Sequence, residues 1–168
     1  MQDCYFYSAS DHDKHLLVES FDDEPLVNLE LINSVNTDAM LKNVKRVLNI
    51  KYNLGKHRPI LILEGYRLYD DSRIRDLIDL PIFIHLDNMT IRERRYSQGD
   101  PDHEYVQMCL LPSYVQYRHR CRYVMNNLLQ LDGKDDYDDL CNKIKDILVK
   151  KADVTYPLMD FRTPMFQF

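Results

Sequence analysis

Residues 60–65 read Ile60-Leu61-Ile62-Leu63-Glu64-Gly65, an unbroken apolar run that ends in an acid and a glycine. Runs that are apolar on both faces are typical of parallel strands that helices cover on both sides. Two further runs of this kind, 82–86 and 128–131, are each followed by an aspartate. The three runs therefore predict strands of one parallel sheet.

Stretches with helical periodicity separate these runs. Residues 37–50 place apolar side chains on one helical face, and Asn36 is a suitable N-cap for that helix. The other helical stretches are 90–96, 104–127 and 136–151. Strands that alternate with helices predict an α/β fold, with a parallel sheet flanked by helices. We expect one such domain over residues 1–151 and an irregular C-terminal tail over residues 152–168.

Charge and hydropathy narrow the possible partners. The chain carries 22 basic and 27 acidic side chains, and residues 1–30 hold eight of the acids with a single base. An acidic segment repels phosphate backbones, so we expect no nucleic-acid partner. No apolar stretch of about 18 residues occurs, so we expect no membrane partner. The acidic segment is either a solvated loop or part of a site.

The cysteines favour a reducing compartment. The four cysteines are scattered, and they form neither a C-x-x-C motif nor a paired Cys/His spacing. This pattern supports neither a zinc site nor a disulfide framework. Since the sequence also shows no secretory signal pattern, we expect reduced thiols and a cytoplasmic location.

Acidic side chains follow the predicted strands. In open parallel sheets, ligands bind beyond the carboxyl ends of the strands. The acids expected at those ends are Asp3, Glu64, Asp87 and Asp132. Such a carboxylate can hold Mg²⁺ or take a proton from a hydroxyl, or it can cap the next helix. Capping is our interpretation of Asp87 and Asp132.

Arginines cluster just after the second predicted strand. The cluster consists of Arg92, Arg94 and Arg95. An arginine cluster near strand ends suits the charge of a phosphoryl group, whereas the alternative is a solvated basic helix face.

Six short motifs occur in a distinctive order. They are Gln2-Asp3-Cys4-Tyr5-Phe6, Asn28-Leu29-Glu30, residues 60–66, Arg94-Arg95, residues 112–118 and Leu131-Asp132-Gly133. In order and spacing they resemble the nicotinamide riboside kinase family, within the uridine-kinase-like P-loop kinases. The resemblance covers residues 1 to about 151 and implies a nucleoside-kinase-like domain.

The resemblance implies a role for each matching residue. Asp3 would be the catalytic base that removes the proton of the ribose 5′-hydroxyl, and it would hold Mg²⁺ together with Glu64. The residues implied to border the nucleoside are Asp3, Cys4, Tyr5, Phe6, Leu29, Glu30 and Arg95, with Glu30 on the ribose hydroxyls. Those implied to bind ATP are Arg94, Asp135, Asp136 and Tyr137.

The sequence departs from the family at the phosphate-binding loop. The family begins with a strand and a Walker A loop, G-x-x-x-x-G-K-[ST], which cradles the phosphates. The four glycines, at 55, 65, 99 and 133, cannot form this motif anywhere in the chain. We therefore expect an N-terminally truncated domain that lacks the central first strand, about 30 residues in all. As an alternative, strands 60–63 and 82–86 pair directly.

The resemblance implies ATP-dependent phosphorylation of the 5′-hydroxyl of nicotinamide riboside, a step of NAD biosynthesis. The cofactors would be ATP and Mg²⁺, and the partner a small nucleoside. Since the Walker A loop supplies much of the charge stabilisation in this chemistry, we expect weak activity or none. The alternatives are a non-catalytic relative that binds a nucleoside or a partner, and a fragment of a uridine or other nucleoside kinase.

Overall fold

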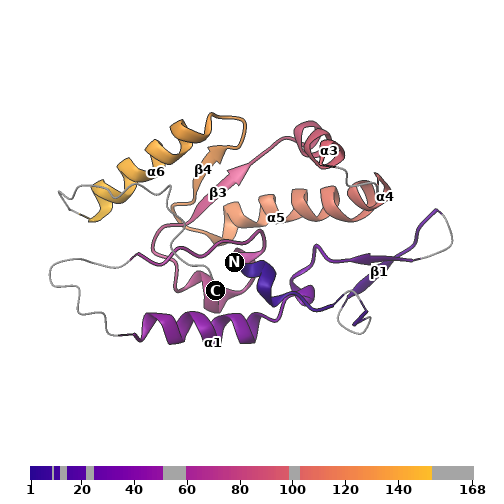
Figure 1. Ribbon diagram of the computed structural model, residues 1–168, viewed down its shortest axis with the longest axis horizontal. Helices are drawn as coiled ribbons and strands as arrows, with labels where there is room; N and C mark the ends of the chain where they lie inside the picture. The colour runs from indigo at the N-terminus through magenta and orange to yellow at the C-terminus, as the bar shows by residue number, and fades with distance from the viewer. Residues whose placement is uncertain (9, 12–14, 22–24, 51–59, 99–102, 153–168) are drawn as a thin grey trace.

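The computed structural model describes residues 1–8, 10–11, 15–21, 25–50, 60–98 and 103–152, which form a mixed α/β structure (Figure 1). The strands are β1 (Leu16–Val18), β2 (Leu26–Asn28), β3 (Ile82–His85) and β4 (Leu129–Asp132). The α-helices are α1 (Thr37–Leu48), α2 (Ser72–Arg75), α3 (Asn88–Ser97), α4 (His103–Tyr105), α5 (Leu111–Val124) and α6 (Tyr137–Ala152). Short 3₁₀ turns are η1 (Gln2–Tyr5), η3 (Ile32–Ser34) and η4 (Leu68–Asp70), and η5 (Val106–Leu110) is a π-helical segment.

Two of the three predicted strands form, and they pair as expected. β3 and β4 are parallel, with Ile82 opposite Leu129 and His85 opposite Asp132. α5 lies between them in the sequence, as a parallel connection requires. The prediction that 82–86 and 128–131 are strands of one parallel sheet is therefore confirmed.

The predicted strand at 60–63 is wrong. Residues 60–65 belong to no strand, and among the described residues 60–63 do not pair with β3. Ile60, Leu61 and Ile62 are exposed, and only Leu63 packs against the core. An apolar run does not specify a pairing partner, and tyrosine side chains occupy the edge of β3 that a neighbouring strand would need.

The helices begin where their caps predict, with one exception. Asn36 caps α1 by accepting from the amide of Ala39 at 3.0 Å, and Asp87 caps α3 by accepting from Thr90 at 2.8 Å. The expected capping role of Asp132 is wrong, because Asp136 caps α6 instead, accepting from the amide of Asp138 at 2.8 Å. Asp132 accepts from the amide of Lys134 within the turn that precedes α6.

The long helix predicted over 104–127 is divided into α4, the π-helical η5 and α5, which follow one another without a break. Pro112 lies at the start of α5 and cannot donate to a carbonyl of the preceding turn, which explains the change of helix type there. Val106 and Cys109 of η5 are fully buried. π-helical segments are frequent at functional sites, and Tyr105 directly precedes this one.

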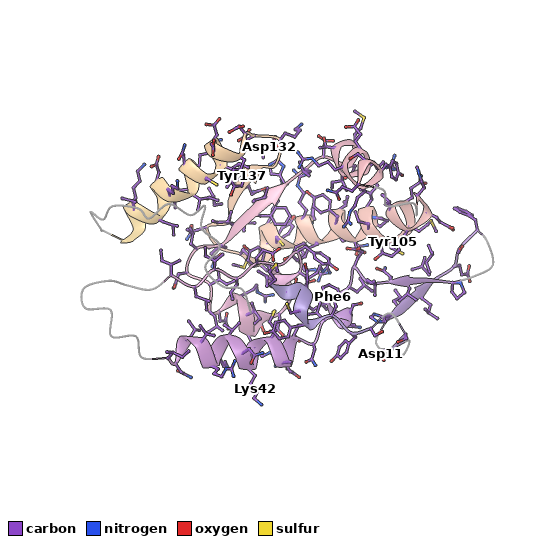
Figure 2. All side chains as sticks on the ribbon, in the orientation of Figure 1. Phe6, Asp11, Lys42, Tyr105, Asp132 and Tyr137 are labelled. Carbon is purple, nitrogen blue, oxygen red and sulfur yellow. The ribbon has the colours of Figure 1, made fainter. Side chains whose placement is uncertain are left out.

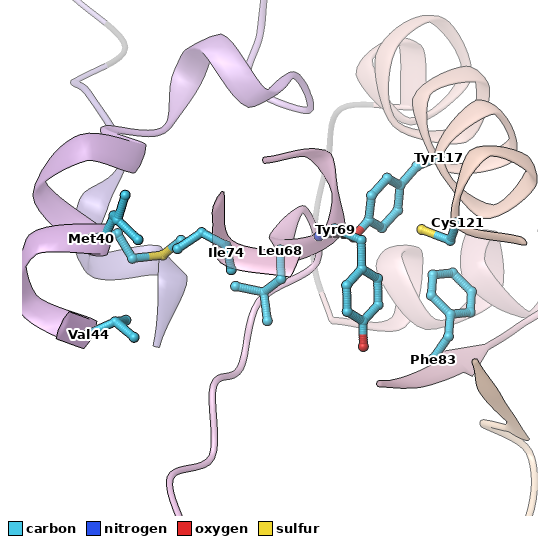
Figure 3. Close-up of a cluster of buried hydrophobic side chains, with 9 residues drawn as sticks. Met40, Val44, Leu68, Tyr69, Ile74, Phe83, Tyr117 and Cys121 are labelled. Carbon is cyan, nitrogen blue, oxygen red and sulfur yellow. Dashed lines mark hydrogen bonds between the residues drawn. The ribbon is translucent and has the colours of Figure 1, made fainter. Parts of the chain in front are cut away.

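The main core lies between α1 and α5 (Figure 3). α1 contributes Met40 and Val44, whereas α5 contributes Tyr117 and Cys121. Leu68, Tyr69, Ile74 and Phe83 fill the space between the two helices. The core therefore fixes the segment around η4 against both helices.

The acidic N-terminal region contains a hairpin that the sequence analysis did not predict. β1 and β2 pair antiparallel, with Leu16 opposite Asn28 and Val18 opposite Leu26. The region is therefore not a loop throughout, but none of its acids belongs to either strand, and Asp3, Asp11 and Glu19 are exposed as the solvated interpretation expects.

None of the described helices is both long enough and apolar enough to span a membrane. All four cysteines, which lie in the described part of the chain, are free thiols. α6 extends to Ala152, and the remainder of the predicted tail, 153–168, lies outside the described residues.

Candidate functional site

Three segments that are distant in the sequence meet at Glu30. The hydroxyl of Tyr105 donates to Oε1 of Glu30 at 2.9 Å and accepts from the amide of Leu29 at 3.2 Å. The hydroxyl of Tyr66 donates to the carbonyl of Leu29 at 2.8 Å. We call Leu29, Glu30, Tyr66, Tyr105 and Arg95 the Glu30 cluster, since Arg95 acts on the Glu30 carboxyl through its charge.

Burial controls the proton affinities in this cluster. Burial raises the pKa of Glu30, while the bond from Tyr105 and the charges of Arg95 and Arg67 oppose that rise. Burial likewise raises the pKa values of Tyr66 and Tyr105, and the negative charge of Glu30 adds to both increases. Both hydroxyls therefore remain protonated donors beside an acceptor carboxylate.

The N-terminal turn η1 is anchored to the segment that precedes Tyr66. The amide of Gln2 donates to the carbonyl of Glu64 at 2.8 Å, and Oε1 of Gln2 accepts from the amide of Arg67 at 3.0 Å. Gln2 is 1% exposed, and a Cβ added at Gly65 would lie 2.4 Å from its Cβ. Only glycine at position 65 permits the Gln2 side chain to lie this close. The close packing of η1 on this segment places Asp3 next to the residues around Glu64.

The predicted substrate-binding residues of η1 separate into two groups. The ring of Phe6 stacks on that of Tyr66, with centroids 5.9 Å apart and an interplanar angle of 12°. Asp3 and Cys4 are exposed, and the charge of Asp3 raises the pKa of Tyr66. Tyr5 instead packs against the core and accepts a hydrogen bond from Asn43 of α1. Phe6 and Asp3 therefore lie near the Glu30 cluster, whereas Tyr5 supports the fold.

The predicted ATP-binding residues lie together at another place. In the view of Figure 2, Asp132 and Tyr137 lie on one side of α5 and Phe6 lies on the other. Arg94 donates from its guanidinium to the carbonyl of Gly133 at 2.9 Å, which joins α3 to the turn after β4.

The side chains of that turn already have structural roles. Asp135 forms an ion pair with Lys143 at 2.6 Å, and Asp136 caps α6. The ring of Tyr137 is 76% exposed and therefore offers an aromatic face.

The expected magnesium ligands fit the ion only in part. Asp3 and Glu64 are both exposed, on segments joined by the Gln2–Glu64 backbone bond. Within the described residues, no group of three or more His, Cys, Asp or Glu side chains is arranged to hold a metal. Mg²⁺ commonly uses one or two carboxylates together with substrate phosphates and water. Two carboxylates are compatible with that scheme only when phosphates complete the coordination.

Two contributors to this region were missed by the sequence analysis. Tyr105 is not among the predicted site residues, although its hydroxyl donates to Glu30. Glu104 accepts from the amide of Phe21 at 2.6 Å and from the hydroxyl of Ser20 at 3.1 Å, which fastens the loop after β1 to α4. The hydrogen bonds of Tyr105 and Glu104 join residues more than 70 positions apart in the sequence, so local sequence patterns could not predict them.

No protein-family model matches the chain, and no curated protein matches it either. The chemistry of the clustered residues is therefore the basis for inferring a function. The surface has one shallow hollow over α1 and another over α5. The hollow over α5 is lined by Val115, His119 and Tyr123, among other residues. Neither of these two hollows includes a residue of the Glu30 cluster.

Proposed function

We propose that the Glu30 cluster binds a ribonucleoside and that the chain is a nicotinamide riboside kinase-like phosphotransferase. The proposal depends on the convergence of Tyr66 and Tyr105 on Leu29–Glu30, where Tyr105 bonds to the Glu30 carboxyl and both hydroxyls bond to the Leu29 backbone. Phe6, Leu29–Glu30 and Tyr66, which come from three of the motifs that resemble the kinase family, are thereby linked, and Tyr105 joins them from outside those motifs.

The chemistry of the cluster suits a sugar diol and a flat ring. An ionised carboxylate only accepts hydrogen bonds, so Glu30 can receive both hydroxyl hydrogens of a ribose. The stacked rings of Phe6 and Tyr66 provide an aromatic surface next to it. Arg95, whose charge lowers the pKa of Glu30, helps to keep that carboxyl in its acceptor form.

Catalysis in this proposal depends on Asp3. Its exposed carboxylate would accept the proton of the ribose 5′-hydroxyl, with Glu64 beside it as a second oxygen ligand for Mg²⁺. When bound, ATP and Mg²⁺ supply the transferable phosphoryl group and neutralise its charge. Arg94 and the turn of Asp135, Asp136 and Tyr137 would hold the nucleotide. Because the 168 residues contain no Walker A motif, we expect the chain itself to turn over slowly or not at all.

The second candidate is a nucleoside-binding protein without catalysis, and the absence of a Walker A motif from the sequence favours it. Calorimetry with nicotinamide riboside and with uridine, followed by an assay with ATP and Mg²⁺, distinguishes the candidates. Riboside binding with measurable phosphorylation supports the kinase and excludes the second candidate, whereas binding alone supports nucleoside recognition without catalysis by this chain. Preference for uridine would point to another nucleoside kinase, and failure to bind either nucleoside would overturn both candidates.

A further inference from the structure

In the described part of the chain, β3 has a strand neighbour on one edge only, because the sheet it forms with β4 has two strands. At the ends of the ladder, the carbonyl of Pro81 accepts from Leu129 and that of His85 accepts from Gly133. Alternate residues of a strand direct their backbone groups to the same edge. The backbone groups of Ile82, Ile84 and Leu86 therefore face away from β4.

Two tyrosine hydroxyls occupy this outer edge. The hydroxyl of Tyr69 donates to the carbonyl of Ile82 at 2.7 Å and accepts from its amide at 2.9 Å. The hydroxyl of Tyr114 does the same at Leu86, with distances of 2.9 Å and 3.0 Å. Each hydroxyl thus satisfies both backbone groups of one residue, as a residue of a paired antiparallel strand would.

Both rings are held by packing. Tyr69 belongs to η4 and stacks on Tyr117, with centroids 6.5 Å apart. Tyr114 belongs to α5 and stacks on Phe83 of β3, with centroids 6.4 Å apart. The two hydroxyls therefore come from different elements, and each is fixed at one end of β3.

We infer that Tyr69 and Tyr114 close the outer edge of β3 against pairing with a second copy of this chain. An unpaired strand edge is a template for adding another strand, and apolar β-branched residues strengthen that tendency. Between the two tyrosines, the side chain of Ile84 is 54% exposed. The outer edge of β3 thus carries an exposed apolar β-branched residue that promotes strand addition. The tyrosine hydroxyls occupy the backbone groups at its two ends.

A second copy is the partner that fits this edge best. Two identical edges can pair antiparallel around a two-fold axis, which is the commonest symmetry of protein dimers. Pairing centred on Ile84 would place Ile84 opposite its counterpart and Ile82 opposite Leu86. These are the positions whose backbone groups face outward, so the register of the suppressed dimer is defined.

The test removes both rings from the edge. The variant with both Tyr69→Ala and Tyr114→Ala is compared with the unaltered chain by sedimentation velocity over a range of concentrations. We expect its association constant to rise by about tenfold to a hundredfold, because the outward backbone groups of β3 become available for interchain hydrogen bonds. The control is Tyr123→Ala, whose ring is 77% exposed on α5. A folded double variant with unchanged association overturns the inference.

Two further measurements locate the effect. Adding Ile84→Lys to the double variant places two charges opposite each other in the expected register, and the chain should return to its original mass. A dimer that survives this change forms elsewhere, which contradicts the inference. If the double variant does not fold, hydrogen exchange of the single variants Tyr69→Phe and Tyr114→Phe tests whether each hydroxyl protects its end of the β3 edge. Tyr69→Phe should accelerate exchange of the Ile82 amide about tenfold and leave Leu86 unchanged, whereas no difference between the two amides overturns the inference.

Discussion

The hydroxyl of Tyr105 donates to the carboxylate of Glu30 at 2.9 Å, across 75 positions of the sequence. The same hydroxyl accepts from the amide of Leu29, so α4 holds both residues that follow β2. Burial raises the pKa of this carboxyl and the bond from Tyr105 opposes the rise. The charge of Glu30 is therefore maintained by its neighbours, and changes to those neighbours or to pH have predictable consequences.

Stability should depend on pH through Glu30. Its pKa is higher in the folded chain than the ordinary glutamate value, so the folded state binds the proton more tightly than the unfolded state. The Glu30 contribution to the free energy of unfolding must then fall as pH rises from the ordinary value through the raised one. We expect Glu30→Gln to lack this fall. Urea denaturation of both proteins between about pH 4 and pH 7 measures the difference, and parallel profiles would contradict the prediction.

The loop after β1 should loosen when Glu104 loses its charge. Glu104 accepts from the amide of Phe21 at 2.6 Å, and a bond to a charged acceptor is stronger than one to a neutral amide. We expect Glu104→Gln to accelerate hydrogen exchange of the Phe21 amide about fivefold, which corresponds to about 1 kcal/mol. Glu93→Gln on the exposed side of α3 is the matched control. Equal exchange in the two variants would show that Glu104 does not hold the loop.

Substitution of Gly65 should destabilise the fold beneath the site. Its added Cβ would lie 2.4 Å from Cβ of Gln2, an atom attached directly to the anchored η1 backbone. We expect Gly65→Ala to lower the free energy of unfolding by about 1–3 kcal/mol. Gly133→Ala should cost less, since its Cβ first meets the end of the Leu86 side chain at 3.0 Å. A larger loss for Gly133→Ala, measured by denaturation, would refute this explanation.

Local patterns in the sequence were sufficient for α1, α3 and α6 and for β3 and β4. Asn36 and Asp87 lie at the helix starts because their side chains cap amides only three residues away. β3 and β4 combine apolar runs with a helical connection, which is sufficient to predict a parallel pair. These features depend on interactions within a few residues or on simple periodicity.

The remaining features depend on contacts between distant residues. The run at 60–63 has the composition of a strand, yet the edge it would need is held by Tyr69 and Tyr114. No periodicity in the sequence indicates that a tyrosine hydroxyl will replace a strand. Likewise, Glu30 was predicted as a site residue through a resemblance, but its bond to Tyr105 appears only when α4 is placed against the segment after β2.

The central claim is that Glu30 recognises a ribonucleoside, and calorimetric titration with nicotinamide riboside tests it most directly. The comparison uses the unaltered chain, Glu30→Ala and Glu19→Ala, the last being an exposed acid of the same acidic segment. Hydrogen bonds to a charged acceptor predict that Glu30→Ala weakens riboside binding by about 10- to 100-fold, while Glu19→Ala leaves it unchanged. Equal affinities for all three proteins, or no binding to the unaltered chain, would contradict the claim.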